Sequence, residues 1–167
     1  MDDLVMPASA ALWFLPFAVP IALWAAWNDM RAMKIPNTAV LLLTLAFTLV
    51  GVIALPFDEY LWRWLQLVIV LVVGFLLSTA GLIGAGDAKF AAAMAPYFAM
   101  QDGLAITFLF AGILIVSFGA HRVARVTPAI RDLTPNWESW TRGDFPMGLA
   151  LGSLLIVYLL LAAMGGS

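Results

Sequence analysis

An aspartate and a lysine interrupt a long apolar part of the chain at Gly84-Ala85-Gly86-Asp87-Ala88-Lys89, and they are the only charged residues between Trp64 and Gln101. Charge is costly at membrane depth, so an ionisable residue in an apolar region is by default a candidate for function. The two glycines allow a sharp backbone turn and the close approach of a bound peptide chain. The stretch therefore predicts a break between two membrane segments that carries a functional acid.

A second acid, Asp29, closes the first apolar segment in Trp27-Asn28-Asp29-Met30-Arg31-Ala32-Met33-Lys34-Ile35-Pro36-Asn37. Pro36 disfavours helix in the residue before it, and Asn37 can cap the next helix, so this stretch predicts the turn between two spans. Each acid then lies at the edge of a membrane segment. The hypothesis is that Asp29 and Asp87 act together.

The composition assigns the chain to a class before any motif is considered. Hydrophobic residues make up 64% of the 167 residues and charged residues 11%, whereas a soluble domain has about 25% charged residues. The mean hydropathy is +1.02. With ~20 residues for each span, this length predicts an all-α bundle of about six transmembrane helices in a lipid bilayer, forming a single membrane-embedded domain over residues 1–167.

Residue counts exclude several kinds of partner and cofactor. The net charge is −2 and only eight lysines and arginines are present, which argues against nucleic acid as a partner. The chain has no cysteine and a single histidine, His121, which excludes disulfides and ordinary zinc sites built from its residues. We therefore expect no cofactor and no metal.

The apolar runs predict six spans, at residues 4–28, 38–55, 65–83, 88–100, 104–120 and 146–164. Pro16 and Pro20 fall inside the first span and predict a kink or local unwinding. The fourth span is short for a ~30 Å crossing, because a helix rises ~1.5 Å per residue. Residues 56–64 are expected to form an acidic turn at the lipid surface. Residues 121–144 should form a polar loop, with His121 at the interface and Trp137 and Trp140 on a short helix resting on the membrane.

Basic residues give the predicted orientation, because lysine and arginine favour cytoplasmic loops. With the N-terminus outside, the alternation of six spans leaves Arg63 outside and seven basic residues inside: Arg31, Lys34, Lys89, Arg122, Arg125, Arg131 and Arg142. This bias predicts the orientation of a multi-pass protein, which we expect in the cell inner (plasma) membrane. The same alternation brings Asp29 and Asp87 to the cytoplasmic side, where they can meet.

The chemistry of two neighbouring carboxylates follows from their shared proton. Carboxylates a few Å apart do not both ionise easily, so one can act as base on a water and the other as acid on a carbonyl, as in aspartic proteases. Asp87 begins a helix, whose positive dipole end favours the anion, whereas Asp29 ends one. Buried acids also serve as proton relays or cation sites in transporters, which leaves a carrier as an alternative.

Three parts of the sequence resemble the prepilin peptidases: Asp29 followed by Arg31 and Ile35-Pro36-Asn37, then Gly84-Ala85-Gly86-Asp87-Ala88-Lys89, then Phe145-Pro146-Met147-Gly148. Members of that family are membrane aspartic proteases that cleave the leader from type IV prepilins on the cytoplasmic side. The resemblance implies that Asp29 and Asp87 are the catalytic pair and that a prepilin is the substrate. It also implies roles in shaping the site or binding substrate for Gly84, Gly86, Lys89, Pro36, Asn37, Pro146 and Gly148.

One departure from the family pattern narrows the resemblance. Larger bifunctional members carry a cysteine-rich zinc segment and methylate the new N-terminus, whereas this chain has no cysteine. It is therefore most similar to the compact, peptidase-only members that serve Flp (tad) pili. The opposing hypothesis is a non-enzymatic membrane module, either a proton-coupled carrier or a pilus-assembly scaffold. A carrier should show inverted repeats with paired broken helices, and a scaffold should have lost one aspartate.

Overall fold

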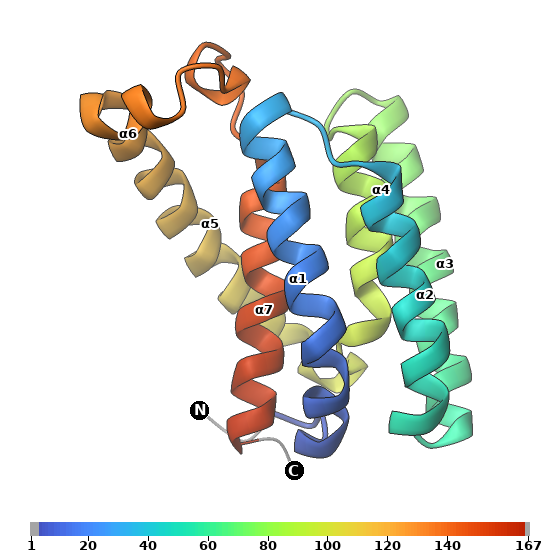
Figure 1. Ribbon diagram of the computed structural model, residues 1–167. Helices are drawn as coiled ribbons and strands as arrows, with labels where there is room; N and C mark the ends of the chain where they lie inside the picture. The colour runs from blue at the N-terminus through green and yellow to red at the C-terminus, as the bar shows by residue number, and fades with distance from the viewer. Residues whose placement is uncertain (1–3, 166–167) are drawn as a thin grey trace.

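The computed structural model describes residues 4–165, which form an all-α bundle (Figure 1). The long helices are α1 (Ala8–Ala32), α2 (Asn37–Ala54), α3 (Phe57–Thr79), α5 (Gly103–Val126) and α7 (Met147–Gly165). The shorter helices are α4 (Ala85–Met94) and α6 (Pro128–Leu133), and 3₁₀ turns cover Ala95–Tyr97, Met100–Asp102 and Glu138–Trp140.

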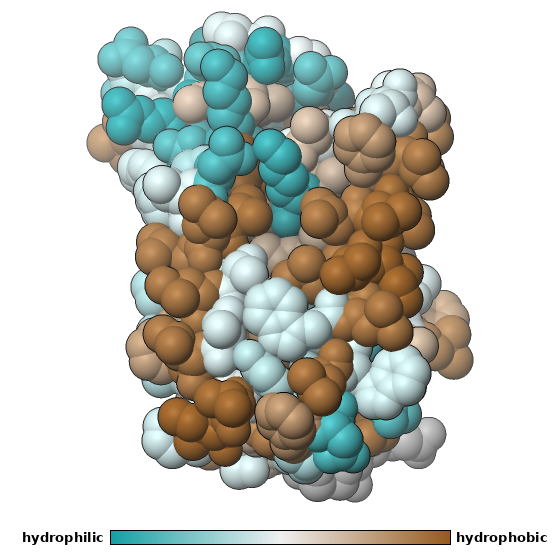
Figure 2. All heavy atoms as spheres, turned by 90° about the vertical axis from the view of Figure 1, so that its right-hand side faces the viewer, coloured by the Kyte–Doolittle hydropathy of each residue, from teal (hydrophilic) through white to brown (hydrophobic). Residues whose placement is uncertain are grey.

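Five helices of the described chain are long and apolar enough to cross a membrane: α1, α2, α3, α7 and α5 with the turn before it. Figure 2 shows a broad belt of apolar side chains on one face of the bundle, with hydrophilic residues gathered above it at one end. Such a belt suits contact with lipid tails. The prediction of an all-α, multi-pass membrane protein is therefore confirmed.

The fourth predicted span differs from the other five, because α4 has only 10 residues. Two 3₁₀ turns continue it, and together they lead the chain from the end where α3 stops to the end where α5 begins (Figure 1). The alternation of chain direction is thereby preserved. As a result α1 ends and α4 begins at the same end of the bundle, which we call the aspartate end.

Several predicted boundaries are wrong. α3 begins at Phe57 instead of residue 65, so residues 57–64 are helix and not a turn; Asp58 and Glu59 lie in its first turn, where carboxylates complement the helix dipole. α5 continues to Val126, beyond the predicted end at residue 120. α1 is an uninterrupted helix that contains both Pro16 and Pro20, so the predicted local unwinding does not occur.

The centre of the bundle is the contact between α1 and α7, which run side by side in opposite directions (Figure 1). Small residues make this contact close: a Cβ atom built on Gly152 would lie 2.8 Å from the carbonyl oxygen of Ala22. Gly148 and Gly152 face α1 one turn apart, in the spacing that lets membrane helices approach closely. This packing carries the start of α7 to the end of α1, where Asp29 lies.

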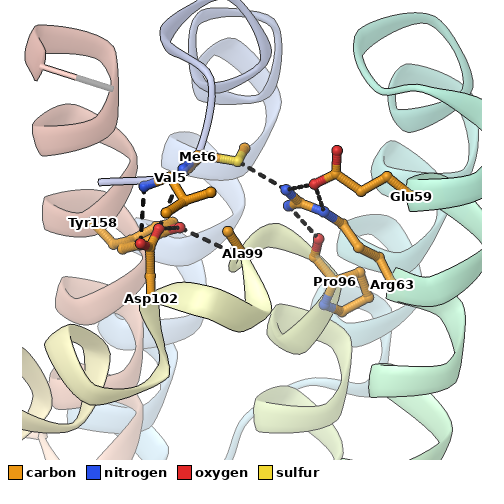
Figure 3. Close-up of polar contacts among 8 residues, drawn as sticks. All are labelled: Val5, Met6, Glu59, Arg63, Pro96, Ala99, Asp102 and Tyr158. Carbon is orange, nitrogen blue, oxygen red and sulfur yellow. Dashed lines mark hydrogen bonds and ion pairs between the residues drawn. The ribbon is translucent and has the colours of Figure 1, made fainter. Parts of the chain in front are cut away.

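A buried carboxylate holds together the end of the bundle opposite the aspartates (Figure 3). Asp102 accepts hydrogen bonds from the backbone N–H groups of Val5 (2.9 Å) and Met6 (3.3 Å) and from the Tyr158 hydroxyl (2.7 Å). The same hydroxyl accepts the backbone N–H of Ala99 at 3.0 Å. The start of the described chain, the turn before α5 and the end of α7 are therefore joined through one side chain.

Arg63, the one basic residue that the sequence places on the outer side, is buried within the protein, with 2% of its surface exposed. Its guanidinium pairs with Glu59 one turn earlier on α3 and donates to the carbonyl oxygen of Pro96 at 3.1 Å (Figure 3). A buried arginine requires such partners, because leaving its donors unsatisfied is costly. Arg63 thus links α3 to the 3₁₀ turn that follows α4, and Glu59 compensates its charge.

Candidate active site

Asp29 lies in the last turn of α1, and its side chain is buried at 5% exposure. Its Oδ2 accepts the backbone N–H of Gly148 at 2.7 Å, at the first turn of α7. The positive end of the α7 dipole therefore faces this carboxylate and offsets the unfavourable position of Asp29 at the end of its own helix. A Cβ atom on Gly148 would lie 2.8 Å from the Cβ of Asp29, so only glycine permits this approach.

The turn after Asp29 is held in an uncommon backbone conformation. Met33 ends α1 with φ 49° and ψ 39°, in the left-handed region, and its N–H donates to the carbonyl oxygen of Asp29 at 2.8 Å. The Asn28 amide donates to the carbonyl oxygen of Lys34 at 2.6 Å and closes the turn. A non-glycine residue rarely adopts this conformation, so the surrounding contacts must stabilise it.

Asp87 is the third residue of α4 and is half-buried. Its carboxylate turns back toward the backbone N–H of Gly84, in the manner of an acid at the third position of a capping box. A Cβ atom on Gly84 would lie 2.6 Å from the Asp87 Oδ2, so this glycine leaves room for the carboxylate. Gly74 of α3 lets α3 pack closely against α4, because a Cβ atom at this position would lie 3.0 Å from the Cβ of Ala88.

The two aspartates interact electrostatically. Burial, followed by the negative charge of Asp29, raises the pKa of Asp87 from 3.8 to about 6, while the Gly84 N–H acts in the opposite direction. A like charge has this effect because it disfavours the ionised form. The negative charge of one carboxyl group thus favours the protonated form of the other.

Both aspartates line one cleft of about 1010 Å³ at the aspartate end. The loop after α1 forms one side of it, and the loop before α4 forms another together with the first turn of α4. The two sides meet where Gly86 of α4 lies next to Ile35. Lys89 and Asn37 lie at the rim, and the lysine Nζ is 3.4 Å from the asparagine Oδ1. The structure thus brings together residues from two motifs that are far apart in the sequence.

The predicted site residues divide into two groups. Those that line the cleft are Asp29, Asn37, Gly84, Gly86, Asp87 and Lys89. Pro36 instead precedes the first residue of α2, and Pro146 precedes α7, where its carbonyl oxygen accepts the N–H of Leu149. Gly148 contributes its N–H to Asp29. No group of three or more histidine, aspartate or glutamate side chains placed to hold a metal ion occurs among residues 4–165.

Arg142, Asp144 and Phe145 also line the cleft, although the sequence analysis assigned a role to none of them. They belong to the segment between α6 and α7, which folds back over the aspartate end (Figure 1). The Phe145-Pro146-Met147-Gly148 motif drew attention only to the end of this segment. Nothing local in the sequence indicated the contacts of the residues before it.

A row of aromatic rings holds this segment in place. Trp140 stacks on His121 of α5 at 5.5 Å between ring centroids and on Trp137 at 5.6 Å, and Trp137 meets Trp27 of α1 edge to face at 4.8 Å. His121 is 3% exposed and Trp140 is buried as well. The two tryptophans therefore bind the segment to α1 and α5. That His121 lies at the membrane interface, and that a short helix here rests on the membrane, stay predictions. The tryptophans within an otherwise polar segment were the available signal.

Two carboxyl groups that line one cleft and interact electrostatically are the groups that general acid and base catalysis on a peptide carbonyl needs. Residues 16–120 match the type IV leader peptidase family, and this stretch contains both aspartates and more than half of the chain. No curated protein and no solved structure matches the chain. On the family match, which agrees with the geometry of the cleft, the chain belongs to the type IV leader peptidase family.

Proposed function

We propose that this protein is a membrane aspartic endopeptidase that removes the leader peptide from type IV prepilins of the Flp type at the cytoplasmic face. The observation that carries the proposal is the placement of Asp29 and Asp87 in one cleft, close enough for the charge of Asp29 to raise the pKa of Asp87. Membership of the leader peptidase family supports a prepilin as the substrate.

The reaction uses one proton held between the two carboxyl groups. The ionised carboxylate takes a proton from a water, whose oxygen attacks the carbonyl carbon of the scissile peptide bond, while the protonated carboxyl group donates its proton to the carbonyl oxygen. The resulting tetrahedral intermediate collapses with transfer of a proton to the departing amine. The N–H groups of Gly148 and Gly84 orient the two carboxylates during these steps.

The proposed orientation rests on the basic residues. The aspartate end carries Arg31 in the last turn of α1, Lys34 in the loop after it and Lys89 near the start of α4, and the segment that follows α5 at this end adds Arg131 and Arg142. Arg63 lies toward the opposite end, where Glu59 compensates its charge. Because lysine and arginine favour the cytoplasmic side, the aspartate end faces the cytoplasm of the inner membrane.

The peptidase-only activity is supported by the residue types available. The 167 residues contain no cysteine, so they do not build the cysteine-ligated zinc segment of bifunctional relatives. We therefore propose cleavage without methylation of the new N-terminus, as in the compact members that serve Flp pili.

Co-expression with a Flp-type prepilin tests the proposal, with cleavage followed by the size of the pilin on a gel. Asp29→Asn and Asp87→Asn should each abolish cleavage at matched membrane levels, because asparagine keeps the shape but cannot exchange the proton. The double variant should be hardly worse than either single one, since the two groups act as a unit. Asp132→Asn, an exposed aspartate of α6 outside the cleft, is the matched control and should cleave normally.

The non-enzymatic alternatives predict a different result. A proton-coupled carrier or an assembly scaffold would leave the prepilin uncut even with the wild-type protein. Normal cleavage by either single aspartate variant would remove that residue from the catalytic role.

A further inference from the structure

One peptide group lies between the residues that precede the two aspartates. Asn28 of α1 directly precedes the first aspartate, and its side-chain amide donates a hydrogen bond of 2.6 Å to the carbonyl oxygen of Lys34. Gly86 of α4 directly precedes the second, and a Cβ atom built on it would lie 3.7 Å from the backbone nitrogen of Ile35. That carbonyl and that nitrogen belong to the same planar group. We call this group the Lys34–Ile35 peptide.

The contact on the Asn28 side depends on the turn that ends α1. Met33 has φ 49° and ψ 39°, and this left-handed conformation is uncommon for a residue other than glycine. The chain turns there, so that the carbonyl of Lys34 reaches a side chain six residues earlier. Within the described part of the chain, the Asn28 amide provides the one hydrogen bond to the Lys34–Ile35 peptide. This bond therefore holds the peptide in place after the turn.

The contact on the Gly86 side is made by packing. Ile35 is buried and belongs to the hydrophobic core. A Cβ atom on Gly86 would lie 3.7 Å from the Cβ of Ile35 and 3.9 Å from its carbonyl oxygen, which are ordinary van der Waals distances. Gly86 is the second residue of α4 and Asp87 is the third. A displacement of the Lys34–Ile35 peptide would therefore shift the start of the helix that bears Asp87.

The packing of the helices fixes α1 and α4 as whole elements. α1 packs mainly against α7 and α2, and α4 packs against α3, α2 and α7. The ends of α1 and α4 that bear the acids approach each other at the Lys34–Ile35 peptide. Two carboxyl groups that act on one bond must be held at a defined separation, because a catalytic group must lie within hydrogen-bond reach of its target. The peptide is thus the local spacer between them.

We propose that Asn28 is a positioning residue, which sets the distance between the two proposed catalytic carboxyl groups through the Lys34–Ile35 peptide. The inference rests on the proposed function, in which the two groups act as a unit. Asn28 does not line the cleft, so it acts through the peptide and not on the substrate. Its amide donates a hydrogen bond without adding a charge beside the aspartates.

A disulfide probe measures this link without any substrate. The chain has no cysteine, so Ile35→Cys with Gly86→Cys introduces the only thiols. The two Cβ atoms would lie 3.7 Å apart, within the range of about 3.5–4.5 Å found in disulfides. In protein purified in detergent, oxidation by copper phenanthroline should form the bond, and the thiols left for a maleimide label report its rate.

Removal of the Asn28 amide should slow this oxidation. In the chain with both cysteine substitutions, Asn28→Ala should lower the rate at least ~5-fold, the change expected from the loss of one hydrogen bond. Asn28→Leu, which keeps the shape of the side chain without the donor, is the second variant and should have the same effect. Asn136→Ala is the matched control, because Asn136 is exposed and lies outside the cleft, and it should leave the rate unchanged.

Cleavage kinetics distinguish positioning from stability. In a chain without the cysteine substitutions, Asn28→Ala should lower kcat for prepilin cleavage at least ~10-fold, since a displacement of ~1 Å can cost ~100-fold in rate. KM should stay nearly unchanged, because Asn28 lies outside the cleft. The rates are referred to folded protein, whose fraction is measured by thermal unfolding. Asn136→Ala should keep both constants.

The outcomes separate this link from the proposed function. Equal rates of disulfide formation with and without the Asn28 amide would overturn the link, and so would a wild-type kcat in both Asn28 variants. A lower melting temperature with an unchanged kcat of the folded protein would show that the bond only stabilises the turn, which also overturns the proposal. Absence of wild-type cleavage together with slower disulfide formation in both variants would overturn the peptidase proposal and leave the link between the two segments in place.

Discussion

Gly148→Ala tests whether α7 positions the carboxylate of Asp29, one of the two proposed catalytic groups. The added Cβ would lie 2.8 Å from the Asp29 Cβ and 3.0 Å from its Oδ2, whereas an ordinary contact begins at 3.4 Å. Either α1 and α7 separate by about 0.6 Å or the carboxylate rotates and loses the 2.7 Å hydrogen bond from Gly148. Overpacking of this kind costs about 1–3 kcal/mol of stability. A displacement of a catalytic group by ~1 Å can cost ~100-fold in rate.

We therefore expect Gly148→Ala to lower the melting temperature and to reduce prepilin cleavage about 100-fold in the protein that remains folded. The assay is cleavage of purified prepilin in detergent, with the rate referred to folded enzyme. Gly112→Ala is the matched control, since a Cβ at this helical glycine meets nothing within 4 Å. A Gly148→Ala variant with the wild-type rate and melting temperature would refute the role of α7 in holding Asp29.

Three further predictions concern proton sharing, the far end of the bundle and cofactors. The cleavage rate should fall as pH rises above about 6. The pKa of Asp87 is raised to about 6, so above this pH the pair loses the single proton that the mechanism needs. A cleavage rate that does not change with pH in this range would contradict the prediction. Asp102→Ala should destabilise the protein by about 3 kcal/mol or more, because it leaves the N–H groups of Val5 and Met6 and the Tyr158 hydroxyl without their acceptor, and thermal unfolding measures the loss. Cleavage should survive chelators and thiol reagents and should leave an unmethylated N-terminus when a methyl donor is supplied. A pilin product heavier by one methyl group would show that the activity has been misjudged.

Features that depend on neighbouring residues were correctly predicted from the sequence. Long apolar runs predicted membrane helices, because hydropathy sums over ~20 consecutive residues. The charged break at Asp87 and the turn after Asp29 predicted acids at two helix ends, and the count of spans placed both at the same end of the bundle. The boundaries failed where an acidic or polar stretch was still helical, as in the first turns of α3.

Features that depend on contacts between distant residues were decided by the tertiary structure. The hydrogen bond that holds Asp29 comes from a residue 119 positions later, and it exists because glycines let α7 lie against α1. The burial of Arg63 and Asp102 follows in the same way from partners on other segments, although both residues appear suited to the surface when judged by charge alone. Residue type and spacing thus determined which side chains could do the chemistry. Only the packing of helices from distant parts of the chain determined which backbone groups face them and which surfaces stay free for a substrate.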